Sequence, residues 1–353
     1  MQRTWATIYA IFCTLLMAAG FIAAFYFSWL SGTGDILACL IGMLIGFMFS
    51  STVHELGHIL FATLSGMECV YVKFFCFAFG RGTDGKMKRS LVSPFADDRT
   101  QVLPKHSKNM QSRACAYTLG GLAFGSLFLL IVLVVALITT CLGAPNYLFW
   151  GMLPYAAYLV LLNVVPLEYA SGKTDMLVFV GLKKGYDAEK TMLSAMEIHG
   201  CLYEGKSFAE IDEGKYYDLP QLCEDEPLYA VILDLRYRYH LEKEEYEKAA
   251  DCLNRLAQSQ AYLPDEELEK VAAELTYMHA LNGDLESAEE SGKLCREFLQ
   301  KELVTSKRVL AAFSAAFGKA DAAEALKAQA EELLTTERLV GVRKFEERLL
   351  SRI

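Results

Sequence analysis

The residues with the clearest chemical potential are His54, Glu55 and His58, in the run His54-Glu55-Leu56-Gly57-His58. On a helix, residues four apart lie above one another on one face, so both imidazoles can point at one metal ion. A glutamate beside the first histidine can take a proton from a metal-bound water molecule. The spacing therefore predicts a zinc site in which Glu55 is the general base.

The setting of this motif separates it from a chance pattern or a pair of satisfied core histidines. The stretch 36–53 contains no Lys, Arg, Asp or Glu, and the apolar run continues to Leu64. About 20 apolar residues are enough to cross a bilayer. Ionisable side chains inside such a span are costly and are by default functional. The motif is thus expected to lie within a membrane.

Charge is distributed unevenly along the 353 residues, which are enough for two domains. Residues 1–184 carry a net charge of +5, whereas residues 185–353 carry −14. A hydrophobic content of 53% favours membrane segments. No basic stripe indicates a nucleic-acid partner. We predict a membrane-embedded domain over 1–184 and a cytoplasmic helical domain over 185–353.

Four apolar segments are long enough to be transmembrane helices, namely Ile8–Leu30, Ile36–Leu64, Cys115–Cys141 and Asn146–Leu167. A signal peptide is the alternative for the first, but its apolar core would be only about 7–15 residues long. Nine Lys and Arg residues lie between Gly66 and Ala114, and none lies in the two short opposing loops. The positive-inside rule therefore predicts cytoplasmic termini. We expect a multi-pass protein in contact with lipid, in a bacterial plasma membrane.

The predicted fold is an all-α polytopic membrane domain followed by a soluble all-α domain. The exception is Tyr71–Phe79, whose aromatic and β-branched residues predict a short β segment after the motif helix. In the third span, Gly120, Gly121 and Gly125 are spaced so that a neighbouring helix can approach closely.

Three stretches of the acidic half look alike, namely Glu244–Ala257, Leu285–Leu299 and Ala320–Leu334. The alanines Ala249, Ala288 and Ala322 are separated by 39 and 34 residues, close to the period of a tetratricopeptide repeat. A plain helical bundle fits the pattern equally well. In either case this half is expected to offer a surface for a protein partner.

A catalytic zinc site needs a third protein ligand and keeps its fourth position for water. The fourth span is interrupted at Asn163 and Pro166, and Asp175 opens a further apolar piece. The candidate carboxylates are Glu168 and Asp175. Measured from the cytoplasmic side, Asp175 lies at a depth similar to that of the motif, which favours it as the ligand. Its alternative role is a helix cap.

Taken together, residues 8–184 resemble the site-2 protease family of intramembrane zinc metalloproteases. That family pairs HExxH on one transmembrane helix with NxxP and a later Asp-Gly on another, and here Asn163-Val164-Val165-Pro166 precedes Asp175. The family's Asp-Gly spacing would fall on Ser171-Gly172, so Asp175 requires a longer loop.

The resemblance implies a Zn²⁺ ion held by His54, His58 and Asp175, with Glu55 as the base. It also implies that Asn163 orients the substrate or stabilises the oxyanion. Satisfying backbone groups freed at Pro166 is the alternative role for Asn163. The expected activity is hydrolysis of peptide bonds in membrane-spanning or membrane-associated proteins, with the substrate added as a strand along Tyr71–Phe79.

Two other functions are possible for such a chain. A non-proteolytic membrane metal-binding scaffold could recruit partners through the C-terminal helices, but it would have no need of Glu55. A transporter would show paired repeats among its spans, and the four spans show none.

Overall fold

The computed structural model describes residues 2–81, 86–93, 99–170, 172–224, 226–258 and 265–353. Over these residues the chain is mostly helical, with a small antiparallel sheet. It divides into two compact units. Unit 1 comprises most of residues 2–186, and unit 2 comprises Asp187–Ile353 together with the short segment Pro104–Lys108.

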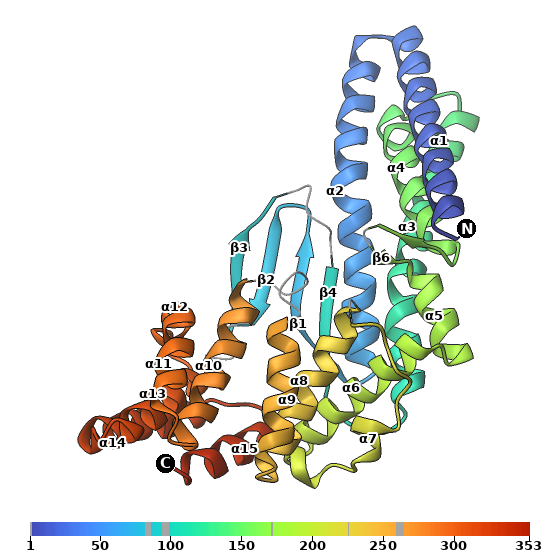
Figure 1. Cartoon of the computed structure of the whole chain (residues 1–353). Coiled ribbons are helices and arrows are strands. Elements are labelled where there is room, and N and C mark those ends of the chain that lie inside the picture. The colour runs from blue at the N-terminus through green and yellow to red at the C-terminus, as the bar shows by residue number, and fades with distance from the viewer. Residues whose placement is uncertain (1, 82–85, 94–98, 171, 225, 259–264) are drawn as a thin grey trace. The chain divides into compact units, whose positions relative to one another are not determined.

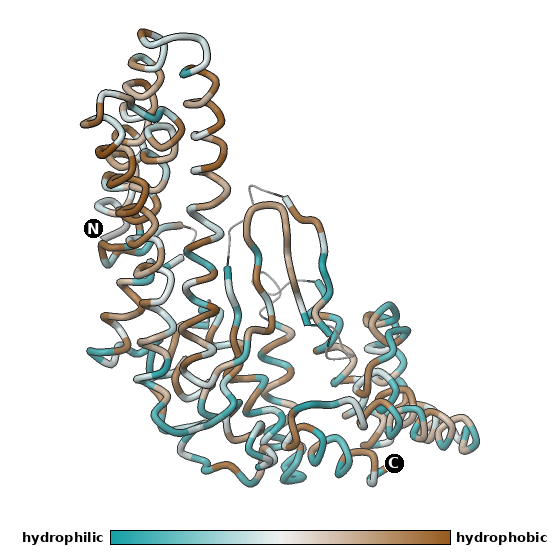
Figure 2. The backbone as a smooth tube through the Cα atoms, turned by 180° about the vertical axis from the view of Figure 1, so that it is seen from behind, coloured by the Kyte–Doolittle hydropathy of each residue, from teal (hydrophilic) through white to brown (hydrophobic). Residues whose placement is uncertain are grey.

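Four long helices dominate unit 1, namely α1 (Gln2–Ser31), α2 (Thr33–Leu64), α3 (Met110–Cys141) and α4 (Tyr147–Val164). Each is long and apolar enough to cross a membrane, and Figure 2 shows hydrophobic colouring along all four. The four predicted apolar segments are thus confirmed as helices. The last ends at Val164 rather than Leu167, because Pro166 lacks an N–H and disfavours helical geometry in Val165 before it.

Helix α2 packs against both α3 and α4, and it approaches α3 closely at Gly57 of the HExxH motif. A Cβ atom on Gly57 would lie 2.3 Å from the carbonyl oxygen of Gly120. A Cβ on Gly120 would in turn lie 2.5 Å from the carbonyl oxygen of Gly57. The two backbones therefore touch directly, which only residues without side chains allow.

A four-stranded sheet follows α2, with the strand order β3-β2-β1-β4 (Figure 1). Its strands are β1 (Met67–Phe74), β2 (Phe77–Arg81), β3 (Met87–Leu91) and β4 (Arg99–Pro104). β1 and β2 form a tight hairpin in which Phe74 pairs with Phe77. This hairpin is the predicted β segment, and the sheet also contains β3 and β4, so unit 1 has more β structure than the single short segment predicted.

The position of the hairpin within the sheet also corrects an expectation about the substrate. β1 pairs with β2 and β4, and β2 pairs with β1 and β3. Both strands of Tyr71–Phe79 are thus interior strands with their backbone groups already used. The prediction that a substrate strand adds along Tyr71–Phe79 is therefore wrong, and the edge strands of the sheet are β3 and β4.

After α4 the chain forms a two-stranded hairpin, β5 (Glu168–Tyr169) and β6 (Gly172–Lys173), and then α5 (Asp175–Lys184). The residue before α5 is Thr174, whose side chain accepts a hydrogen bond from the Leu177 N–H and so caps the helix.

Unit 2 is helical throughout its described residues. Its elements are α6 (Asp187–Tyr203), η1 (Phe208–Glu210), α7 (Gly214–Tyr217), α8 (Pro227–Glu242), α9 (Tyr246–Gln258), α10 (Asp265–Leu281), α11 (Leu285–Leu294), α12 (Arg296–Leu299), α13 (Val304–Ala316), α14 (Ala320–Leu334) and α15 (Val340–Leu350). Consecutive helices pack in pairs: α8 with α9, α10 with α11, and α13 with α14. The second helix of each pair buries an alanine, namely Ala249, Ala288 or Ala323.

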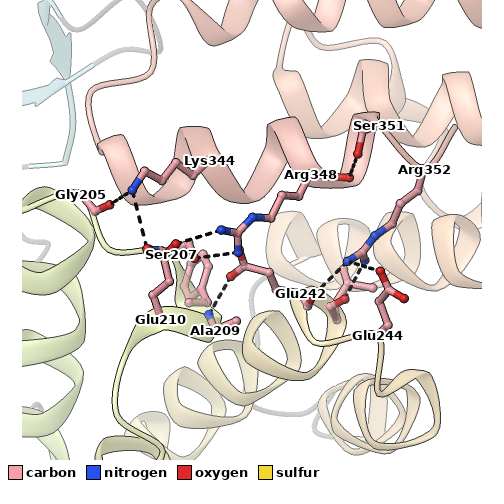
Figure 3. Close-up of polar contacts among 12 residues, drawn as sticks. Gly205, Ser207, Ala209, Glu210, Glu242, Glu244, Lys344, Arg348, Ser351 and Arg352 are labelled. Carbon is pink, nitrogen blue, oxygen red and sulfur yellow. Dashed lines mark hydrogen bonds and ion pairs between the residues drawn. The ribbon is translucent and has the colours of Figure 1, made fainter.

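The last helix closes unit 2 by contacting segments more than 100 residues earlier in the chain (Figure 3). Arg348 donates hydrogen bonds to Glu242 and Glu210, and Lys344 donates to the carbonyl oxygen of Gly205 at 2.7 Å. Arg352 donates to the carbonyl oxygen of Glu242, the last residue of α8. These contacts join α15 to η1 and α8.

Candidate metal centre

The two histidines of the motif face one another on buried turns of α2. Four residues complete about one helical turn, so His54 and His58 project from the same face. Their Nε2 atoms lie 3.3 Å apart. His54, Glu55 and His58 are all at most 8% exposed. The helix thus presents two imidazole nitrogens at one point inside unit 1.

Asp175 completes the cluster from α5. Its Oδ2 atom lies 3.1 Å from Nε2 of His54 and 3.4 Å from Nε2 of His58. Ligands on a tetrahedral zinc ion with bonds of about 2.0–2.1 Å are separated by about 3.3–3.4 Å. The three ligand atoms therefore have nearly the spacing of one face of a zinc tetrahedron, which leaves the fourth position for water.

The polarity of the three atoms also fits a cation. Nδ1 of His58 donates to the carbonyl oxygen of Tyr117 at 2.9 Å, so the neutral imidazole has an unprotonated Nε2. Oδ2 of Asp175 is buried and has no hydrogen-bond partner among the described residues. One proton could satisfy only one pair of these atoms, whereas one divalent ion satisfies all three. A carbonyl that fixes the tautomer of a ligand histidine is a common feature of zinc sites.

Space for an ion is maintained by α3. A Cβ atom on Gly121 would lie 2.3 Å from Nε2 of His58 and 2.8 Å from Nε2 of His54. A side chain at this position would therefore occupy the point where the ligand atoms converge. The sequence marked Gly121 only as a helix-packing residue, and the structure adds this second role.

Glu55 is held by a residue of the sheet. Thr100 on β4 donates its hydroxyl hydrogen to Oε2 of Glu55, with an oxygen–oxygen distance of 2.5 Å. The Thr100 carbonyl oxygen accepts a hydrogen bond from the Tyr117 hydroxyl at 2.7 Å. Since Tyr117 also holds His58, one chain of contacts fixes both the candidate base and a candidate ligand. Nothing in the sequence identified Thr100, which lies in a polar stretch.

The short hairpin explains how Asp175 reaches the cluster despite its long separation from Pro166. The backbone N–H of Thr174 donates to the carbonyl of Leu167, and the Leu167 N–H donates to the Thr174 hydroxyl. Residues 167 and 174 are therefore neighbours in space. Thr174 caps α5, so Asp175 is not needed as a cap and its carboxylate faces the histidines.

The other predicted residues make contacts outside the His54, His58 and Asp175 cluster. Glu168 is exposed on β5, where it pairs with Lys173 across the hairpin. The Asn163 side chain donates to the carbonyl of Leu159 within its own helix, at 3.1 Å. The carbonyl of Leu162, which Pro166 cannot serve, instead accepts a hydrogen bond from the Tyr169 hydroxyl at 3.4 Å. Ser171 lies outside the described residues.

No family model matches this chain, and neither a curated protein nor a solved structure matches it significantly.

Proposed function

We propose that this chain is an intramembrane zinc endopeptidase that hydrolyses peptide bonds of membrane-spanning or membrane-associated proteins. The observation that supports this most directly is the convergence of His54, His58 and Asp175 on one point beside Glu55. A buried set of two imidazoles and one carboxylate with an open fourth position is the ligand set of a catalytic zinc site. The resemblance to the site-2 protease family leads to the same proposal.

Each residue has a definite task in this reaction. A bound zinc ion would supply a water of lowered pKa and polarise the scissile carbonyl. Glu55 accepts the proton of the attacking water and returns it to the leaving amine. Thr100 holds one oxygen of Glu55, which keeps the carboxylate in a single orientation. Asn163 uses one amide hydrogen within its helix, so a second amide hydrogen and its oxygen are available to the substrate.

An extended substrate segment fits the edge of β4 in this proposal. β4 is an edge strand and carries Thr100, the residue bonded to Glu55. A peptide that adds to this edge by main-chain hydrogen bonds would pass close to the base. This arrangement replaces the expected addition along Tyr71–Phe79, which the strand order rules out.

The proposed location is a bacterial plasma membrane, with four spans and cytoplasmic termini. It is supported by four helices of sufficient length and by the basic loop between Gly66 and Ala114. Unit 2 then lies in the cytoplasm. Its three helix pairs, each with a buried alanine on the second helix, favour a tetratricopeptide-like array that contacts a protein partner.

The decisive experiment is Glu55→Gln. This change keeps both imidazoles and removes the proton acceptor, so zinc content should remain while hydrolysis falls by orders of magnitude. Membrane proteomes of cells with parental and variant protein are compared for single-pass proteins that accumulate. Glu168→Gln, which alters an exposed glutamate of the hairpin, is the matched control and should behave as the parent.

Two outcomes would contradict the proposal. A Glu55→Gln protein that cleaves at the parental rate removes the base from the mechanism. The second outcome is a protein that binds zinc but whose deletion leaves the abundance of every membrane protein unchanged. That result favours the alternative function, a metal-binding scaffold that recruits partners through unit 2.

A further inference from the structure

Unit 2 contains a cavity of about 930 Å³. Its walls come from α8, α9 and α10, and from the ends of α13, α14 and α15. Apolar side chains cover much of the wall, including Val231, Val271 and Leu303. Val231 is 41% exposed, so part of this apolar wall is open to an occupant. A volume of this size lies at the upper end of the range for ligand pockets, about 300–1,000 Å³.

The cavity has an excess of negative charge. Among the described residues, eight carboxyl side chains line it, and the basic lining residues are Arg238 and Lys270. Three further bases pair with these carboxylates from outside the lining, namely Arg255, Lys307 and Arg308. Counting all five bases, a net charge of −3 remains among the described residues of the cavity and their partners.

The deep and the outer carboxylates of the cavity differ in whether they can bind an incoming cation. Glu274 and Glu346 share the wholly buried Arg308, at distances of 2.7 and 2.6 Å, so their charge already has a buried partner. The side chains of Glu267 and Glu302 are 49% and 73% exposed, and each pairs only with a lysine. The outer carboxylates can therefore exchange their lysine partners for an incoming cation.

We propose that this cavity binds a cationic peptide segment of a partner protein, in which Lys or Arg residues alternate with apolar ones. A small inorganic or polyamine cation would leave the apolar wall in water. A neutral apolar peptide would bury carboxylates without partners, which is unfavourable. Only a segment with both features matches the wall and the charge together. The binding depends on no property of the metal centre, so it stands or falls separately from the proposed hydrolysis.

The test uses the full chain in detergent micelles and three probes. The first is a fluorescent peptide of sequence KLVKRLVK, the second is its charge-reversed counterpart ELVEELVE, and the third is spermine. Fluorescence anisotropy, corrected for binding to empty micelles, should give a Kd at least about tenfold lower for the cationic peptide than for the acidic one. Spermine should compete only weakly, and added salt should weaken peptide binding.

The variant Glu267→Gln/Glu302→Gln removes two outer carboxylate charges, and each amide oxygen can still accept a hydrogen bond from Lys270 or from Lys307, whose side chain is only 11% exposed. Each exposed charge pair contributes up to about fivefold to Kd, so roughly three- to tenfold weaker binding is expected. Glu289→Gln is the control, because Glu289 lies outside the cavity and pairs with Lys293 as Glu267 pairs with Lys270. Equal binding of both peptides, spermine that binds as tightly as the peptide, or an unchanged Kd in the double variant would overturn the proposal.

Discussion

Unit 2 buries Arg308 against two glutamates, whereas unit 1 buries His54 and His58 against Asp175. In unit 2, the donors of one guanidinium meet the carboxylates of Glu274 and Glu346. Burial alone would lower the pKa of Arg308, but these carboxylates raise it well above its ordinary value. In unit 1, two imidazole nitrogens and a carboxylate oxygen face one another, and one proton among them could satisfy only one pair.

Under the proposed function, this difference separates a structural cluster from one that receives a metal ion. Both clusters are shielded from water, where unpaired polar groups are costly. The guanidinium of Arg308 meets two carboxylates, although its Nη1 atom has no hydrogen-bond partner among the described residues. Under the proposed function, a cation completes the His54 cluster. The chemical types of the buried atoms, rather than burial itself, are thus the useful criterion for finding the candidate metal centre.

The largest expected effect comes from breaking the Arg308 cluster. Arg308→Met leaves Glu274 and Glu346 buried without their shared cation, with the hydroxyls of Tyr237 and Thr305 as remaining donors, and should lower the free energy of unfolding by about 3–5 kcal/mol. Urea unfolding followed by circular dichroism measures this, and zinc content should not change. Adding Glu274→Gln and Glu346→Gln to the variant should recover most of the loss. Unaltered stability of the single variant would show that the network contributes little.

The next effect is weaker zinc binding at the cluster of His54, His58 and Asp175. Asp175→Ala removes one of three candidate ligands and should weaken zinc binding by more than the roughly 10–100-fold typical of an outer-shell contact. Glu168→Ala, on the exposed hairpin, should bind zinc as the parent does. Metal analysis after titration with buffered zinc distinguishes the two. Loss of metal in the Glu168 variant alone would reverse the assignment.

A smaller effect is expected from filling the space beside the ligands. Gly121→Ala places a methyl group against the imidazole nitrogens and should weaken zinc binding about 10–100-fold, the range typical of a disturbed outer-shell contact. Gly125→Ala is the matched control on the same helix, because its Cβ would be 3.6 Å from Nδ1 of His54, an ordinary contact. Equal zinc affinity in both variants would mean that α3 does not shape the site.

The smallest effect concerns an unmatched buried group in unit 2. Burial lowers the pKa of His199 below its usual value; the nearby Asp234 raises it and Arg238 lowers it. The folded state therefore favours neutral His199, and the unfolded chain binds more protons below about pH 6.5. The contribution of neutral His199 to the free energy of unfolding should be fully present above that pH. Below it, the free energy of unfolding should fall by up to about 1.4 kcal/mol per pH unit. His199→Phe should flatten this pH dependence, and a parallel curve would contradict the assignment.

The parts of the fold that depend on local pattern were predictable from the sequence. Helix periodicity placed His54 and His58 on one face, and the length of the apolar runs gave the four helices. The strand order was not predictable, because β3 and β4 are polar and owe their pairing to the rest of the sheet. Thr100 was missed for the same reason. It is distant in sequence from Glu55, and only the pairing of β4 brings it there.

The hairpin between α4 and α5 changes what sequence spacing means in this chain. Leu167 and Thr174 are joined by two hydrogen bonds, and the pairs Glu168–Lys173 and Tyr169–Gly172 extend away from that junction. The hairpin is therefore a side branch on the path from Pro166 to Asp175. A change in its length is expected to leave the carboxylate in place. A sequence pattern with a fixed number of residues between Pro and Asp therefore depends on the length of the β5–β6 hairpin. The position of the Asp175 carboxylate depends instead on the hydrogen-bonded pair Leu167 and Thr174 where the hairpin begins and ends.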